Sequence, residues 1–334
     1  MKRKTSRERK TSRQPGRWYR TLAGMALVAL TACDVEGELD ICPYNARLDY
    51  HYSPHGMERN ELLGYVGKHC QYLFDEGGVL LDTIPLRGTA MLWGEFDLPP
   101  GAYTVVSWAN LDSATAMPAV EPGRTTLDDL RPSTSHPASA PAGFPSAGGW
   151  QADADALYYA YARFRVEAGK VTRKQVEFVS AHCRLTVKVR WKDRAPASGG
   201  DFRMLLRYVP RGYGSDPEYE LDGGAYHIPR VYAEPRAEHV SPAGMDITRE
   251  VNGEIRTARL RDADHPLFSL LRDREVLIRD IDLSRYFRDM GYRLDTNLLQ
   301  DFGLLMEVAA DGSVTVRPLG NSDWIDGGTV GEKV

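Results

Sequence analysis

The stretch KQVEFVSAHCRLTVKVRW at residues 174–191 decides the fold, because it reads as two strands joined with almost no turn. In its second part, from 185 to 191, every second residue is apolar. That alternation is typical of a strand with one buried face. Ser180-Ala181 is therefore the point where we expect the chain to leave one sheet and enter another.

The same alternation recurs along the chain. It is found at 158–166, 302–308 and 313–317, and further strands are predicted at 102–108, 204–209 and 275–281. Asp311-Gly312 lies between the last two runs and predicts a hairpin with a two-residue turn. Helix signals are confined to 58–67 and 282–290, the second with Asp282 or Ser284 as its N-cap. Many short strands with turns between them predict an all-β chain of β-sandwiches with short helices.

Residues 1–32 are typical of a secretory signal peptide. Residues 1–20 carry nine Lys or Arg and one Glu, and residues 22–30, LAGMALVAL, are uncharged and mostly apolar. This run is far shorter than the ~20 residues that span a bilayer. A nucleic-acid-binding arm is the alternative for the basic stretch, and a start codon downstream of Met1 is also open.

The sequence LTAC at 30–33 resembles the lipobox of bacterial lipoproteins and predicts cleavage between Ala32 and Cys33. In such proteins the cysteine thiol and the new amino terminus are both acylated. Each buried CH₂ contributes roughly 0.8 kcal/mol, so three acyl chains anchor a protein stably. Residues 33–42 are then a lipidated tether. Their acidic run, DVEGELD, also resembles the signal that sends lipoproteins of Bacteroides-group bacteria to the outer face of the outer membrane.

Charge and length bound the mature protein. The whole chain carries −4 and residues 1–32 carry +8, so the 302 residues from Cys33 carry −12. This charge does not favour nucleic acid or anionic lipid as a partner. The length suits two domains, which we place at 43–180 and 181–334. Residues 131–149, rich in Pro, Ser, Ala and Gly, are predicted to be a loop rather than the boundary.

With Cys33 lipidated, Cys42, Cys70 and Cys183 remain. Three is an odd number, so one stays free or pairs between chains, and the pairing is left open. Cys70 and Cys183 each follow a histidine, but neighbouring residues on a strand point to opposite faces. We therefore expect buried structural cysteines and no zinc site.

Six segments carry a resemblance through their order: CPYNARLDYHY (42–52), RNELLGYVGKHCQYLFDEGGVLL (59–81), LPPGAYTVVSWAN (98–110), VEFVSAHCRLTVKVRW (176–191), LIRDIDLSRYF (277–287) and FGLLMEVAADGSVTVRPLGNSDW (302–324). With the lipobox ahead of them, they resemble the fimbrium anchor subunit family of Bacteroides-group bacteria, whose pili are called type V. The resemblance implies an outer-membrane lipoprotein with two tandem transthyretin-like β-sandwich domains. Such a protein holds a fimbrium to the cell surface and limits its length. Accessory or tip subunits are the open alternative.

The resemblance also implies how subunits join. Shaft subunits lose an N-terminal strand to a protease, and a neighbour's strand fills the groove by β-augmentation. An anchor fixed by its N-terminal lipid should keep its first strand, near 46–52, and offer only its C-terminal tail, 319–334. A frayed terminus is the alternative for the tail. Its apolar residues form the candidate donor strand: Leu319, Trp324, Ile325 and Val330. The implied partners are a fimbrial shaft subunit (a fimbrillin) and outer-membrane lipid, with no nucleic acid and no small-molecule substrate.

Two other function classes are kept. A surface glycan-binding β-sandwich lipoprotein would use exposed aromatics such as Trp150 or Trp324, although core packing is the default for tryptophan. An envelope hydrolase would use paired carboxylates, for which the candidates are Asp280 with Asp282 and Asp262 with Asp264. These aspartates lie beside turns or helix starts, where Asp is ordinary.

Motifs for enzyme chemistry are missing from the sequence. It contains no nucleophile elbow and no P-loop. His51 and His55 are separated by Pro54 and lack the helical spacing of a metal pair. We therefore predict a protein that is not an enzyme, with no catalytic residue, no metal and no cofactor.

Overall fold

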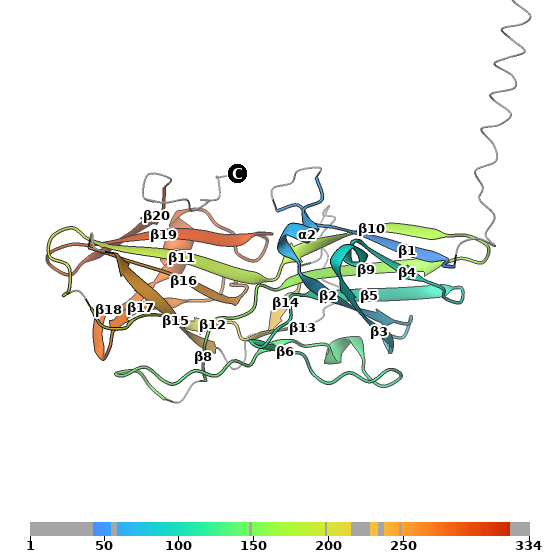
Figure 1. Cartoon of the computed structure of the whole chain (residues 1–334), viewed down its shortest axis with the longest axis horizontal. Helices are drawn as coiled ribbons and strands as arrows, with labels where there is room; N and C mark the ends of the chain where they lie inside the picture. The colour runs from blue at the N-terminus through green and yellow to red at the C-terminus, as the bar shows by residue number, and fades with distance from the viewer. Residues whose placement is uncertain are drawn as a thin grey trace, which may run out of the picture. The chain divides into compact units, whose positions relative to one another are not determined.

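Strands make up almost all of the regular structure (Figure 1). The computed structural model describes residues 43–54, 59–146, 149–197, 199–214, 228–232, 237–246 and 249–320. Ala32, Cys33 and the predicted signal peptide and tether lie outside these residues. Within them the only α-helices are α2 (Leu62–Tyr65) and α3 (Leu283–Asp289), with 3₁₀ turns η1 (Gly88–Leu92) and η2 (Leu127–Asp129). The all-β prediction is confirmed.

The first sheet draws its strands from residues 46–180, in the order β3-β2-β5-β9-β10-β1-β4. Their bounds are β1 Ala46–His51, β2 Lys68–Phe74, β3 Leu80–Arg87, β4 Trp93–Phe96, β5 Gly101–Ala109, β9 Tyr158–Val166 and β10 Thr172–Ser180. Alternate residues of these strands, such as Leu48, Val105 and Phe164, build one hydrophobic core. The strand predicted at 158–166 is confirmed at its exact bounds.

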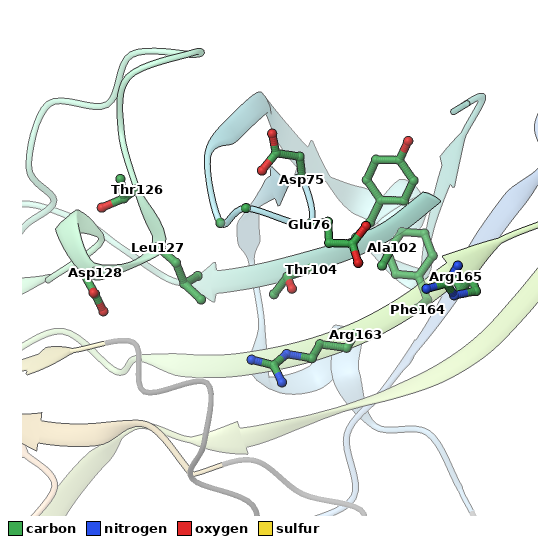
Figure 2. A pocket seen from close by; sticks show the side chains of 13 residues that line it. Asp75, Glu76, Ala102, Thr104, Thr126, Leu127, Asp128, Arg163, Phe164 and Arg165 are labelled. Carbon is green, nitrogen blue, oxygen red and sulfur yellow. The ribbon is translucent and has the colours of Figure 1, made fainter. Parts of the chain in front are cut away.

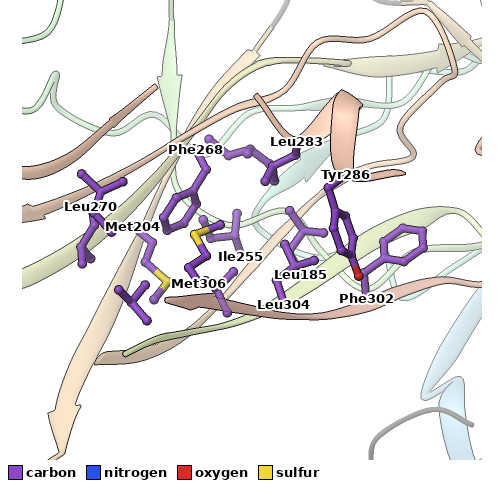
Figure 3. Packing of buried hydrophobic residues seen from close by; sticks show 14 of the residues in the cluster. Leu185, Met204, Ile255, Phe268, Leu270, Leu283, Tyr286, Phe302, Leu304 and Met306 are labelled. Carbon is purple, nitrogen blue, oxygen red and sulfur yellow. The ribbon is translucent and has the colours of Figure 1, made fainter. Parts of the chain in front are cut away.

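The second sheet follows the order β18-β17-β12-β15-β16-β11-β19-β20. The bounds are β11 His182–Trp191, β12 Phe202–Val209, β15 Ala237–Asp246, β16 Glu250–Ala258, β17 Leu267–Arg272, β18 Glu275–Asp282, β19 Gln300–Val308 and β20 Val314–Pro318. Figure 3 shows its core, where Leu185, Met204 and Phe268 meet Leu304 and Met306. Helix α3 packs Tyr286 and Phe287 onto the same core.

Ala181 alone leads from the first sheet to the second, because β10 ends at Ser180 and β11 begins at His182. The predicted crossing point is therefore confirmed. The buried Arg259 guanidinium donates to the Ser180 carbonyl at 2.7 Å, and the Tyr213 hydroxyl donates to the Ala181 carbonyl. These bonds hold the crossing, and the division into two domains at 180/181 stays our proposal.

Two local predictions are refined by the structure. The hairpin at Asp311-Gly312 is present, but Ala309 N–H donates to the Ser313 carbonyl, which closes a three-residue loop. Only Gly312 of the pair takes a positive φ, +81°, so the predicted two-residue turn is wrong; the loop is a turn followed by a bulge. At α3 the N-cap is Asp282, whose carboxylate accepts the N–H of Ser284 at 2.8 Å.

Residues 131–157, which we call the strap, contain the predicted loop and two short strands that pair with other parts of the chain. Strand β7 (Ser133–Thr134) pairs with β6 (Thr115–Ala116) and with β13 (Gly212–Gly214), which in turn pairs with β14 (Arg230–Tyr232). Strand β8 (Trp150–Gln151) then pairs in parallel with β15 of the second sheet. In Figure 1 the strap passes below both sets of strands. A segment between two strands of the first sheet thus becomes part of the second.

Candidate assembly site

The chain's own first strand fills its place in the first sheet. Strand β1 lies between β10, to which it is parallel, and β4, to which it is antiparallel. Ala46, Leu48 and Tyr50 point into the core, and the Tyr50 hydroxyl lies 3.0 Å from Ser107 Oγ. Ahead of β1, the Asn45 side chain bonds both the N–H and the carbonyl of Leu98. The strand expected near 46–52 is therefore present and is held at its entrance.

Strand β20, the last strand in the described residues, forms one edge of the second sheet. Beyond β20, Leu319 N–H donates to the Gly303 carbonyl at 2.9 Å, and the side chain is 3% exposed. A Cβ added at Gly303 would lie 3.1 Å from Leu319 Cβ, so glycine permits this close approach. Leu319 thus continues the edge strand. The other candidate donor residues, Trp324, Ile325 and Val330, lie outside the described residues.

The face of the second sheet that points away from its core carries a buried group that sequence reasoning missed. On β19, Leu304 and Met306 face the core, whereas Leu305 points to the opposite face and is 0% exposed. In register with Leu305 lies Lys188 of β11, which is 3% exposed. The signal was available, because three consecutive apolar residues on a strand place one of them on the second face.

A buried ion pair lies beside Leu305. Lys188 Nζ is 3.1 Å from Glu250 Oε2, and Arg190 Nε is 2.5 Å from Glu250 Oε1. Burial alone would raise the pKa of Glu250, but hydrogen bonds from Arg190 and Lys188 outweigh it and keep the pKa below its ordinary value. A paired, ionised carboxylate is the form that tolerates such burial.

Trp150 is not an exposed aromatic. Its side chain is 3% exposed, its Nε1–H donates to the Pro145 carbonyl, and its ring meets Phe144 edge-on. Core packing is therefore confirmed for Trp150, and it drops out as a glycan-binding residue. Trp108 is also buried, as expected for a core tryptophan.

The paired aspartates each have a structural partner. Asp282 caps α3, and Asp280 accepts from Arg207 and from Ser269 Oγ. Asp264 is buried and pairs with Arg261, and Asp262 accepts the N–H of Leu294 at 2.7 Å. These roles account for both pairs as elements of turns and caps.

A cleft of about 840 Å³ opens at one end of the first sheet (Figure 2). Acidic side chains from the β2–β3 turn and η2 (Asp75, Glu76, Asp128) line it together with Arg163 and Arg165 of β9. The lining contains no histidine, cysteine, serine or lysine. The lining therefore combines carboxylates, guanidinium groups and threonine hydroxyls.

The described cysteines and histidines do not assemble into a metal site. In the described part of the chain Cys70 and Cys183 are both free, Cys70 half-buried and Cys183 buried. Burial raises the pKa of the Cys183 thiol, which makes it an unreactive core residue. His51 Nδ1 lies 2.8 Å from Glu177 Oε2. The described residues contain no group of three metal-ligating side chains, while Cys42 and His55 lie outside them.

Neither helix in the described residues is long and apolar enough to cross a bilayer.

Comparison with known proteins bears on the chain as a whole. The family described as "Fimbrillin-A associated anchor proteins Mfa1 and Mfa2" matches residues 39–320. A sequence comparison with curated proteins finds no match.

Several solved structures share the fold. A proposed polysaccharide-binding protein from Bacteroides thetaiotaomicron has 13% identity and a TM-score of 0.63, covering 84% of this chain and 99% of its own. A proposed adhesin from Bacteroides ovatus has 13% identity and a TM-score of 0.60, covering 86% and 96%. The fimbrial anchor protein Mfa2 from Porphyromonas gingivalis has 16% identity and a TM-score of 0.57, covering 82% and 95%. At these identities the likeness concerns the fold alone.

Proposed function

Because this chain belongs to the family of fimbrillin-A associated anchor proteins, we propose that it fixes a fimbrium to the surface of the cell that makes it. The match over residues 39–320 carries this proposal. Within it, the lipid on Cys33 is the membrane attachment and the C-terminal tail is the attachment to the shaft. Limiting the length of the fimbrium follows if the anchor occupies the last open shaft subunit.

The position of β1 within the first sheet supports the proposal that the chain attaches to the shaft through its C-terminal tail. A subunit that accepts a donated strand must first lose its own strand from the groove. Here β1 is paired on both sides and buries alternate side chains in the core. Because the proposed lipid on Cys33 lies 13 positions before Ala46, where β1 begins, cutting β1 away would release the protein from the membrane. The chain is therefore suited to donate a strand and not to accept one.

The decisive experiment replaces the proposed lipidation site. We expect Cys33→Ala to move fimbriae from the cells to the medium, lowering cell-bound fimbriae at least about tenfold, since the acyl chains supply the membrane affinity. Cell-bound and shed fimbriae are counted by electron microscopy and immunoblotting of the native bacterium. Cys70→Ala is the matched control, because it removes a half-buried cysteine from the same protein.

Two outcomes separate the alternatives. If Cys33→Ala removes the protein from the membrane while fimbriae stay attached, the protein is a lipoprotein with another function, and glycan binding becomes the hypothesis to test. Deleting 321–334 tests the other end. It should leave the protein in the membrane but abolish capture of a shaft subunit, and intact capture would contradict strand donation by the tail.

A further inference from the structure

Tension on an anchor would enter this fold at the start of β1 and leave it beyond the end of β20. Strand β1 pairs in parallel with β10 over six register positions, beginning with Ala46 opposite Thr172. The membrane side pulls the first residue of β1, and the crossing at Ala181 pulls the last residue of β10. Two parallel strands pulled at opposite ends are loaded in shear, so their hydrogen bonds must break together.

The side chains of β1 add to this resistance. Ala46, Leu48 and Tyr50 are buried in the core of the first sheet. A slip of β1 by one residue would turn these side chains out of that core. Ahead of the strand, the Asn45 side chain is bonded at 3.0 Å to the N–H and at 2.7 Å to the carbonyl of Leu98. The first sheet is therefore built to resist a pull along β1.

The second sheet is loaded in the opposite geometry. Strand β11 is parallel to β19, and β20 is antiparallel to β19. The start of β11 and the end of β20 therefore lie at the same end of the sheet. The described chain leaves this end beside Gly303, whose carbonyl accepts the N–H of Leu319. Two antiparallel strands pulled at the same end separate one hydrogen bond after another, which takes less force than shear.

Strand β20 is also held by few buried groups. None of its five residues is fully buried, whereas β19 buries six of its nine. Pro318 lies opposite Leu304 at the end of β20 and has no N–H to donate. The buried group at this end is Leu319, which is 3% exposed and packs over Gly303. The Leu319 contact is therefore the one that must break first.

Detachment of β20 would change the geometry of the load. The pull would then reach Val308, the last residue of β19, at the end of the sheet far from the crossing. Strands β11 and β19 pair in parallel over nine register positions, from Cys183 with Gln300 to Trp191 with Val308. They would now be pulled at opposite ends, as β1 and β10 are. Detachment is thus expected to stop at a pair that is loaded in shear.

We propose that β20 is a strand that tension releases: it detaches from β19 and lengthens the anchor while both sheets stay folded. Residues 309–319 span about 36 Å when extended. The exit point also moves five residues along β19, about 17 Å. The anchor therefore lengthens by about 50 Å under load, and β20 pairs again when the load falls, since hairpins form within microseconds. The inference rests on the proposed function, because an anchor between membrane and shaft carries this load.

Optical tweezers test the proposal on the mature chain from residue 34 onward, held by handles at its two ends. We expect a reversible lengthening of about 50 Å at a lower force than the unfolding of either sheet. Leu319→Ala should shift the equilibrium toward the detached state at least about 30-fold at a given force, because a buried leucine contact is lost. Leu81→Ala is the matched control, since Leu81 is 41% exposed on β3 and lies outside the loaded strands.

A disulfide between β19 and β20 gives a second test. Glu307 and Thr315 lie opposite each other in register, so E307C with T315C places two thiols within reach of a disulfide. Oxidation should cut the lengthening to about half, because only residues 316–319 can then detach, and reduction should restore it. A lengthening that oxidation leaves unchanged overturns the proposal. So does a first event of several hundred ångströms, which is the unfolding of a whole sheet.

These measurements use neither cells nor shaft subunits, which separates them from the tests of the proposed function. A β20 that detaches as expected, with fimbriae still attached in Cys33→Ala cells, keeps the mechanical property and refutes the anchor role. A β20 that holds until a sheet unfolds, with fimbriae lost from Cys33→Ala cells, does the reverse.

Discussion

We expect Trp150→Ala to lower the free energy of unfolding by about 3–5 kcal/mol, the cost of emptying a buried tryptophan site. The expected size is unusual for a residue that follows a Pro-, Ser-, Ala- and Gly-rich segment. Trp150 packs on Leu205 and Leu271, on the opposite face of the second sheet from the main core. Its peptide also pairs with Glu238 of β15.

The strap makes this effect cooperative. Strands β15 and β16 pair only from 243 to 246 and from 250 to 253, and beyond that point the strap lies between them. Ala154 N–H donates to the carbonyl of Arg256, while the Asp153 carboxylate accepts from Ser241 Oγ and Arg256 N–H. Removing the Trp150 side chain thus weakens the contacts of the strap with β15 and β16, which the second sheet needs where these two strands no longer pair with each other.

The strap is also pinned at Phe144. The guanidinium carbons of Arg207 and Arg279 lie 5.1 Å and 5.0 Å from the centre of its ring, on the second sheet's side. Each such contact is worth about 0.5–2 kcal/mol.

Chemical denaturation followed by circular dichroism measures the loss for Trp150→Ala. Trp93→Ala is the control, because Trp93 is half-buried on the edge strand β4 and its truncation should cost clearly less. A change below about 1 kcal/mol for Trp150→Ala would show that the strap contributes little to the stability of the second sheet.

The second large effect is a loss of stability in mild acid. Three histidines, His69, His182 and His239, are buried, and burial lowers the pKa of each to about 4 from the ordinary 6.5. Each ring donates one N–H to a backbone carbonyl: Met91 for His69, Leu157 for His182 and Ala152 in the strap for His239. All three rings are therefore neutral in the folded protein at pH 7.

The direction in which stability changes with pH follows from the protons bound by the folded and unfolded chains. Between pH 6.5 and about 4 the unfolded chain binds protons on these histidines and the folded chain does not, so stability falls as the pH falls. Each histidine contributes about 3 kcal/mol, and the three together about 10 kcal/mol, which is comparable with the whole stability of a domain. The contribution is complete above the unfolded pKa and lost below the folded one. We expect acid unfolding within this window.

Substitutions that keep the hydrogen bond test the assignment. Asparagine imitates the Nδ1–H of His182 and His239, and glutamine imitates the Nε2–H of His69. The slope of the unfolding free energy against pH reports how many more protons the unfolded chain binds than the folded one. Between pH 6.5 and about 4, each of these variants should lower that number by about one. His136→Asn, at an exposed histidine, is the control and should leave the slope unchanged. Buried Asp153 and Glu238 titrate in the opposite sense, and the comparison with the wild type cancels their contribution.

Prediction from sequence succeeded where one strand face is buried. Residues 158–166 and 185–191 alternate because one side meets the core and the other meets water, and the structure has strands at both. The crossing at Ala181 was also predictable, since two alternating runs meet there without room for a turn. The cap at Asp282 follows from local hydrogen bonding, which depends only on neighbouring residues.

The strap could not be predicted from composition. Its Pro, Ser, Ala and Gly residues form no periodic pattern, and their order comes from contacts with strands about a hundred residues away. Trp150 pairs with Glu238, and Ala154 with Arg256. A segment without its own periodicity takes its conformation from the strands beside it. For the strap these are β15 and β16, which stop pairing with each other beyond Ala243 and Gly253 and leave room for it.

The amino-acid order of this chain specifies an all-β fold, its main strands and the point where it passes from sheet to sheet, because period-two burial and turn chemistry are local properties. Packing in three dimensions adds what local pattern does not contain. It inserts the strap into the second sheet, lowers the pKa of three separate histidines and buries Leu305 on the outer face. Each of these depends on which distant residues exclude water from a side chain, and exclusion of water is a property of the assembled fold.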